Sequence, residues 1–214
     1  SSRRFITTML SDLGVEIEFY PPRCNNSITA HFKENTRLLY LESPGSLTFE
    51  LQDIPAMTAL AKERGITTIC DNTWGTALHY PVLELGVDIV VEAATKYIAG
   101  HSDVNLGIAA ANGPHGRKLK ATARNIGICA GPEDLYLGLR GLRTMRLRLE
   151  QSAANGLMLA RALAKHPLVL DVLHPALDSS LDHELYNRDF HGSCGLFGFV
   201  LPETITQDKL DKAV

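Results

Sequence analysis

The spacing of hydrophobic and polar positions changes along the chain, and each spacing predicts a different element. Apolar residues recur at helical intervals over residues 5–13, and Gly14 predicts the end of that helix. In residues 15–20, VEIEFY, apolar and polar residues alternate, which is typical of a β-strand. The N-terminal region therefore predicts a helix followed by a strand.

Longer apolar runs follow and alternate with a helical segment. Residues 36–43, TRLLYLES, predict a strand buried on both faces. Asp53 is a favourable N-cap for a helix over residues 54–65. A further buried strand is predicted for residues 66–70, and two more strands for residues 87–95 and 105–112. Because strands alternate with helices, we expect an α/β domain with a largely parallel sheet.

Beyond residue 113 the pattern becomes mostly helical. Helices are predicted for residues 115–127 and 132–167, and the second is long enough to connect two bodies. Shorter strand candidates appear from about Val169 onward, including residues 195–201, GLFGFVL. A further helix is expected to begin near Thr206.

This change in pattern places a domain boundary near Leu142. Residues 1–142 would be part of a large domain, and residues 143–214 a connecting helix with part of a smaller C-terminal α/β domain. The chain starts directly in a helix without a methionine, and its last strands complete no sheet. We therefore expect both domains to be incomplete and the chain to be the middle of a longer protein.

Composition excludes several classes of protein. Of the 214 residues, 45% are hydrophobic and 21% charged, as in ordinary globular proteins, and the net charge of −3 gives no overall attraction to nucleic acid or anionic membranes. No apolar run approaches the roughly 20 residues that span a bilayer. The four cysteines form no C-x-x-C pair, which favours free thiols in a reducing cytoplasm over a zinc site. They are Cys24, Cys70, Cys129 and Cys194.

Two ionisable groups of opposite sign stand where predicted strands end. Asp71 follows the strand at 66–70, and Lys96 follows the strand at 87–95. In open α/β sheets, ligands bind beyond the carboxyl ends of the strands. Neighbouring strands could therefore bring both side chains to one pocket.

These residue types indicate a particular cofactor. A partly deprotonated lysine can form a Schiff base with a carbonyl compound, and an aspartate can hold a protonated pyridine nitrogen. Together Lys96 and Asp71 indicate pyridoxal 5'-phosphate, and the hydroxyl of Thr95 could bind its phosphate. Charged residues at strand ends also commonly serve as caps, turns or solvated groups, so spacing alone leaves that alternative open.

Two other clusters give weaker signals. Residues 101–103, His-Ser-Asp, have the letters of a hydrolase triad, but adjacent residues cannot converge as nucleophile, base and orienting group. Arg140, Arg143 and Arg146 fall at helical spacing and could form an anion-binding patch. A solvated helix face or a subunit contact is the favoured interpretation of the arginines.

Several longer segments, in order along nearly the whole chain, resemble one enzyme family. They are LESPGS at 41–46, DNTW at 71–74, AATKYIAGHSD at 93–103, RGLRT at 140–144, HPAL at 174–177 and RDFHGSCGLFGFVL at 188–201. Together they resemble the cystathionine β-lyase branch of the Cys/Met-metabolism (trans-sulfuration) pyridoxal-phosphate enzymes. This resemblance implies the aspartate-aminotransferase-like fold, type I, with a large cofactor domain and a smaller C-terminal domain.

The resemblance also implies roles for single residues. Lys96 would bind the cofactor covalently and act as the catalytic base, Asp71 would pair with the pyridine nitrogen, and Thr95 would bind the phosphate. The phosphate loop and ring-stacking tyrosine of the family would precede Ser1, and its substrate-carboxylate arginine would follow Val214. Members similar to this chain are homotetramers whose active sites take residues from a neighbouring subunit.

The reaction implied is elimination from cystathionine to homocysteine, pyruvate and ammonia, in cytoplasmic methionine biosynthesis. Gly45-Ser46 stands where relatives acting at Cγ tend to show Asn-Pro, and Ala93 stands where many relatives carry a phosphate-binding serine. Both differences resemble the β-lyase branch. Cystathionine γ-synthase, cystathionine γ-lyase and methionine γ-lyase of the same family remain alternatives.

An alternative of another class is a regulatory or structural protein on the same fold with little activity. The presence of both Lys96 and Asp71 argues against it, because a protein without catalysis has no physical need for a buried amine.

Overall fold

The structure is a computed structural model that describes residues 2–205. Its helices are α1 (Ser2–Phe5), the π-helical turn η1 (Ile6–Leu10), the 3-10 helix η2 (Asn25–His31), α2 (Ile54–Glu63), α3 (Thr76–His79), α4 (Gly113–Asn125), α5 (Pro132–Leu142), α6 (Met145–Leu163) and α7 (His183–Asp189). Its strands are β1 (Leu38–Glu42), β2 (Thr67–Asp71), β3 (Ile89–Glu92), β4 (Ile108–Ala111), β5 (Asp171–Leu173) and β6 (Gly198–Val200). The helix predicted to begin near Thr206 lies outside the described residues.

The four strands β1 to β4 form one sheet in the order β1-β2-β3-β4. Strands β1, β2 and β3 are mutually parallel, whereas β4 runs antiparallel to β3. In this register Asp71 lies opposite Glu42 of β1 and Val91 of β3. The predicted α/β domain with a largely parallel sheet is therefore confirmed, and the carboxyl ends of β1 to β3 share one edge.

The main core packs against this sheet. Buried side chains of β1 and β2, such as Leu41 and Cys70, pack with Met57 of α2 in one hydrophobic cluster. Helix α2 begins as predicted, because the Asp53 carboxylate accepts a hydrogen bond from the amide of Ala56 at 3.2 Å. Within residues 2–205, none of the helices is both long and apolar enough to span a bilayer.

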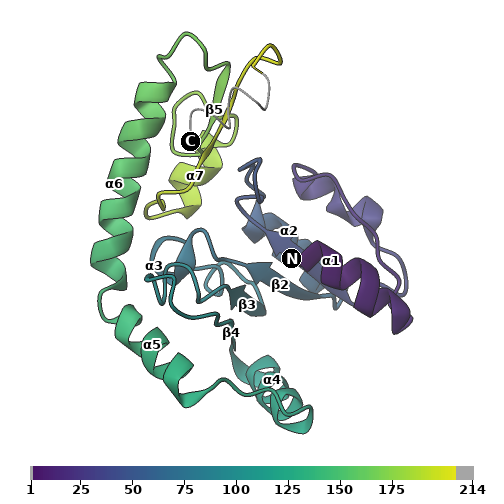
Figure 1. Cartoon of the computed structure of the whole chain (residues 1–214). Helices are drawn as coiled ribbons and strands as arrows, with labels where there is room; N and C mark the ends of the chain where they lie inside the picture. The colour runs from purple at the N-terminus through teal and green to yellow at the C-terminus, as the bar shows by residue number, and fades with distance from the viewer. Residues whose placement is uncertain (1, 206–214) are drawn as a thin grey trace.

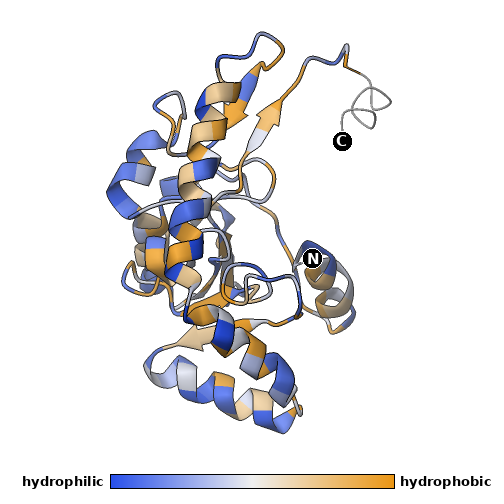
Figure 2. Cartoon of the chain, turned by 60° about the vertical axis from the view of Figure 1, so that its left-hand side comes forward, coloured by the Kyte–Doolittle hydropathy of each residue, from blue (hydrophilic) through white to orange (hydrophobic). Residues whose placement is uncertain are grey.

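The C-terminal part lies at the far end of α6. Figure 1 shows α6 running along one side of the molecule, from α5 to the antiparallel pair β5–β6. A second hydrophobic cluster is built there from Ala160 of α6, Val172 of β5 and Leu177, and hydrophobic residues are spread along α6 (Figure 2). Helix α5 ends at Leu142. The domain boundary near that residue stays a prediction.

The strand predicted for residues 15–20 is wrong. The segment is irregular, and its apolar side chains Val15 and Phe19 are 47% and 53% exposed. On the polar side, Glu16 and Glu18 both pair with Lys33, at 2.7 and 2.8 Å. Among residues 2–205, no strand pairs with this segment. The alternating apolar and polar residues therefore form no strand, and the two glutamates instead form an exposed ion network with Lys33.

The prediction of one long helix over residues 132–167 is also wrong. Helix α5 ends at Leu142 and α6 begins at Met145. The cause is tertiary: a Cβ on Gly141 would lie 2.2 Å from the carbonyl oxygen of Ala99, so the end of α5 packs directly on the turn after β3. At that contact the chain turns, and Thr144 donates its amide to the Gly141 carbonyl at 3.1 Å.

A buried carboxylate joins the C-terminal part to two loops of the N-terminal part, one before η2 and one between β1 and α2. Asp182, at the start of α7, accepts bidentate hydrogen bonds from Arg23 at 2.8 to 3.1 Å. It also accepts the backbone N–H of Leu51 at 2.9 Å. Burying a carboxylate is unfavourable, and these charge-assisted hydrogen bonds from Arg23 and Leu51 compensate for that cost.

We predict that Asp182→Ala lowers the free energy of unfolding by about 2–4 kcal/mol, because it leaves the Leu51 amide and the Arg23 guanidinium without their acceptor. Urea unfolding of the full-length protein measures the change. The matched control is Asp178→Ala, since the Asp178 side chain is 101% exposed; it should change stability by less than about 0.5 kcal/mol. Equal effects of the two substitutions would contradict the assigned role of Asp182.

Candidate active site

Asp71 and Lys96 lie at the same edge of the sheet. Asp71 is the last residue of β2 and stands in register with Val91 of β3. Strand β3 ends at Glu92, and residues 93–103, the lysine turn, follow it. This turn carries Lys96, whose backbone N–H donates to the Ala93 carbonyl at 2.9 Å. Parallel pairing of β2 and β3 therefore brings the two predicted residues to neighbouring turns.

A single hydroxyl group ties these two turns together. Thr73 donates both its backbone N–H, at 3.0 Å, and its hydroxyl, at 2.6 Å, to Oδ1 of Asp71. The same hydroxyl accepts the backbone N–H of Ala93 at 2.8 Å. The carboxylate is thus oriented by the segment that leads into the lysine turn. Sequence reasoning missed Thr73, although a hydroxyl two residues after an aspartate is a recognisable turn signal.

Thr95 fastens the other side of the lysine turn. Its backbone N–H donates to the Leu106 carbonyl at 3.0 Å, and its hydroxyl accepts the Leu106 N–H at 2.8 Å. The hydroxyl hydrogen is directed to the oxygens of Leu106 or Asn105, at 3.2 and 3.3 Å. These bonds hold the turn against the segment leading to β4. The assignment of Thr95 to a cofactor phosphate stays a prediction.

The amine of Lys96 is exposed and pairs with no carboxylate of residues 2–205. An unpaired amine at a strand end is available for covalent chemistry with a carbonyl compound. The exposure also corrects the expectation of a buried amine, so burial of Lys96 no longer argues against a non-catalytic protein. Asp71, by contrast, is partly buried.

The segment before β6 packs against both turns. Trp74, which follows Asp71, donates its indole N–H to the Leu196 carbonyl at 2.9 Å. Cys194 is fully buried; burial raises the pKa of its thiol to about 11, while the nearby Tyr97 hydroxyl and Lys96 ammonium oppose that rise. The C-terminal part of the chain therefore packs against the segments that carry Asp71 and Lys96.

The arginines Arg140, Arg143 and Arg146 do not form one anion-binding patch. Arg140 pairs with Asp103 of the lysine turn at 2.7 Å, and Arg146 pairs with Glu150 one helical turn away at 2.7 Å. The solvated interpretation is therefore confirmed for Arg146, whereas Arg140 helps to hold the lysine turn.

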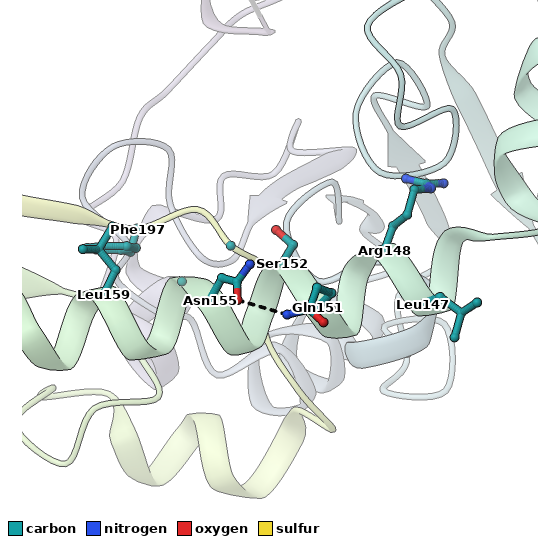
Figure 3. A pocket seen from close by; sticks show the side chains of 9 residues that line it. Leu147, Arg148, Gln151, Ser152, Asn155, Leu159 and Phe197 are labelled. Carbon is teal, nitrogen blue, oxygen red and sulfur yellow. Dashed lines mark hydrogen bonds between the residues drawn. The ribbon is translucent and has the colours of Figure 1, made fainter. Parts of the chain in front are cut away.

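A hollow lies along α6. It is a groove of about 630 Å³ between α6 and the segment from Gly195 to Phe197. Figure 3 shows both apolar and polar side chains lining it, and among the polar ones Gln151 donates to Asn155 at 3.0 Å. Asp71, Thr95 and Lys96 do not line it. The candidate active-site residues therefore lie at the edge of the sheet and not in this groove.

Glu92, the last residue of β3, adds a further carboxyl group near Asp71. Burial, and then the charge of Asp71, raise the pKa of Glu92 to about 7. Its folded-state pKa is therefore higher than its unfolded-state pKa, so between pH 4.5 and 7 the folded state binds more protons. The contribution of protonated Glu92 to the free energy of unfolding is therefore complete below pH 4.5, and it is lost as the pH rises through about 7.

We predict that Glu92→Gln makes the full-length protein more stable than the parent by about 1–2 kcal/mol at pH 8, after allowance for solvent screening, and no more stable below pH 4.5. Urea unfolding as a function of pH measures the difference. Glu84→Gln, at an exposed carboxylate, is the control and should give no such pH dependence. Parallel pH profiles for the parent and Glu92→Gln would contradict the assignment.

Comparison with known proteins gives a consistent result. The sequence profile of the family described as Cys/Met metabolism PLP-dependent enzyme matches residues 1–213. A Rhizobium johnstonii protein provisionally named a cystathionine β-lyase is 48% identical over 94% of this chain, which covers 50% of that protein. Cystathionine β-lyase MetC of Escherichia coli is 39% identical over 98% of the chain and 53% of its own length. The chain thus spans about half the length of these curated relatives.

A solved structure agrees with the sequence relatives. The crystal structure of cystathionine γ-lyase from Lactobacillus plantarum, complexed with L-serine, has a TM-score of 0.92 and 28% identity over 95% of this chain and 54% of that one. This likeness confirms the predicted aspartate-aminotransferase-like fold, type I. With its mixed sheet, its Asp71 and Lys96 turns at one edge and its match over residues 1–213, the chain belongs to the Cys/Met-metabolism pyridoxal-phosphate-dependent enzymes.

Proposed function

We propose that the protein is a carbon–sulfur lyase that uses pyridoxal 5'-phosphate to eliminate homocysteine from cystathionine, with release of pyruvate and ammonia. The observation that carries this proposal is the hydrogen-bonded bridge from Asp71 through Thr73 to Ala93, because it fixes a carboxylate beside the turn of an unpaired lysine. The similarity to cystathionine β-lyases supports the choice of substrate.

The side chains of this site fit the cofactor. Lys96 would hold it through its amine, Asp71 would hold a proton on its ring nitrogen, and the hydroxyl of Thr95 would bind its phosphate. When bound, pyridoxal phosphate supplies a conjugated ring that accepts the electron pair left at Cα when a proton departs. The two donors from Thr73 orient the Asp71 carboxylate, because both hydrogen bonds end on the same oxygen, Oδ1.

Lys96 then moves the proton. With the substrate's amino group bound in its place, the amine of Lys96 would be free to take the Cα proton as a general base. The Cβ–S bond breaks, and the sulfur leaves with the electron pair as the thiolate of homocysteine. The remaining three-carbon fragment takes up water to give pyruvate and ammonia, so the overall reaction is hydrolytic and needs no oxidant.

A γ-elimination or γ-replacement enzyme of the same family is the second candidate, and the structural likeness to a cystathionine γ-lyase favours it. The loop after β1 supports the β-lyase, because it carries Gly45-Ser46 rather than Asn-Pro. A protein with little activity on the same scaffold is a third possibility that product analysis separates from both.

The proposal extends to assembly and location. A homotetramer is supported by four apolar side chains of α5 that are each more than half exposed, namely Leu135, Tyr136, Leu139 and Leu142. Action in the cytoplasm is supported by the four cysteines, which are all free. Size-exclusion chromatography with light scattering tests the first: a monomeric full-length enzyme would contradict the tetramer.

The full-length protein, supplied with pyridoxal phosphate and cystathionine, is predicted to form pyruvate and homocysteine in equal amounts. Lys96→Ala should abolish turnover with the fold intact, and Lys62→Ala, at an exposed lysine of α2, should retain it. Formation of 2-oxobutyrate and cysteine instead would assign the protein to the γ-lyases. No product from a folded, cofactor-loaded enzyme would favour the protein with little activity.

Thr73→Val should lower kcat by about 10- to 100-fold, because it removes a hydrogen bond to a charged carboxylate and leaves the Ala93 amide unpaired. Thr73→Ser keeps the hydroxyl and should restore most of the rate. Steady-state kinetics on the two full-length variants measures this. Equal rates for the valine and serine substitutions would show that the bridge has no part in the reaction.

A further inference from the structure

We propose that Arg148 is a positioning residue that holds the Lys96 turn in place for the cofactor, an inference that rests on the function proposed above. Arg148 belongs to α6 and is remote in sequence from the Asp71 and Lys96 turns. Its side chain extends away from the helix (Figure 3) and reaches the turn after β3.

One guanidinium group joins three elements. Nη2 of Arg148 donates to the Ile98 carbonyl of the lysine turn at 3.2 Å and to the Gly141 carbonyl of α5 at 2.7 Å. Nε donates to the hydroxyl of Thr144, the residue before α6, at 3.1 Å. The lysine turn, the end of α5 and the start of α6 therefore meet at Arg148.

This arginine has no counter-ion among residues 2–205, unlike its neighbours Arg140 and Arg146. Burial lowers the pKa of Arg148. Taking a cation partly out of water without a carboxylate is unfavourable, so the acceptors must be well placed to hold it. Two of its acceptors are backbone carbonyls and the third is the Thr144 hydroxyl, so Arg148 restrains the backbone of the segments it contacts.

Gly100 permits the close approach of Arg148 to the lysine turn. A Cβ built on Gly100 would lie 1.7 Å from Nη1 of Arg148, and Gly100 has a φ of +75°, which L side chains rarely adopt. The guanidinium of Arg148 therefore occupies the space that a side chain at position 100 would need. Any side chain at position 100 would displace the guanidinium.

The contact completes the restraints on Lys96. The turn is tied on its N-terminal side by the amide of Ala93, which donates to Thr73, and by Thr95, which bonds to Leu106. On its C-terminal side, two residues beyond Lys96, the Ile98 carbonyl is held by Arg148. Without Arg148 the amine would sample more positions, so the cofactor should dissociate faster although the sheet remains intact.

The test uses the full-length holoenzyme and four variants: Arg148→Met, Arg148→Lys, Gly100→Ala, and the double variant Gly100→Ala with Arg148→Met. The rate of pyridoxal-phosphate release is followed through the visible absorption band, together with the pH midpoint of that band. We expect release from Arg148→Met to be about 10- to 100-fold faster, the cost of losing hydrogen bonds from a charged donor. The midpoint should shift by about 0.5 pH unit or more.

The other variants separate a positioning role from general destabilisation. Gly100→Ala should accelerate release similarly, and the double variant should be no faster than the faster single variant, because both changes break one contact. Arg148→Lys keeps the charge but cannot reach all three acceptors, so it should fold normally and still release the cofactor faster than the parent. Arg146→Met is the control and should match the parent.

Parent-like release and pH midpoint in Arg148→Lys and Gly100→Ala would overturn the inference, as would fully multiplicative effects in the double variant. Failure of the proposed function is a different result. It would appear as a Lys96→Ala variant that keeps the visible band of the parent, whatever Arg148 does.

Discussion

The parallel pairing of β2 with β3 is the constraint on which the rest of the site depends. Its register sets Asp71 opposite Val91, so the turn after each strand opens at the same edge of the sheet. The Asn72 amide extends the pairing by one bond, to the Val91 carbonyl at 2.9 Å. A slip of one residue would turn Asp71 to the opposite face, because successive side chains of a strand alternate. Hydrophobic burial of Cys70 and Val90 resists that slip.

The remaining parts of the chain restrain the two turns from outside. The segment before β6 contacts the aspartate turn through Trp74, and Arg148 holds the lysine turn against α5 and α6. Asp182 joins α7 to Arg23, which precedes η2, and to Leu51 in the loop between β1 and α2. The C-terminal part and α6 therefore contact the turns that carry Asp71 and Lys96.

Features set by local sequence were predictable, and features set by tertiary contact were not. The buried strands β1 to β3 and the Asp53 cap follow from apolar runs and capping chemistry, and they located Asp71 and Lys96 at strand ends. An apolar run carries no direction, so the antiparallel course of β4 was not foreseen. The break between α5 and α6 and the role of Arg148 both arise where Gly141 meets the lysine turn, a contact between segments distant in sequence.

The central claim is that the edge of the sheet between Asp71 and Lys96 binds pyridoxal phosphate through the amine of Lys96. Borohydride reduction of the full-length holoenzyme, followed by digestion and mass spectrometry of the peptides, tests it most directly, because reduction converts a Schiff base into a stable secondary amine. The account predicts one pyridoxyl group per chain, on Lys96. A pyridoxyl group on another lysine, or none from a cofactor-saturated enzyme, would contradict it.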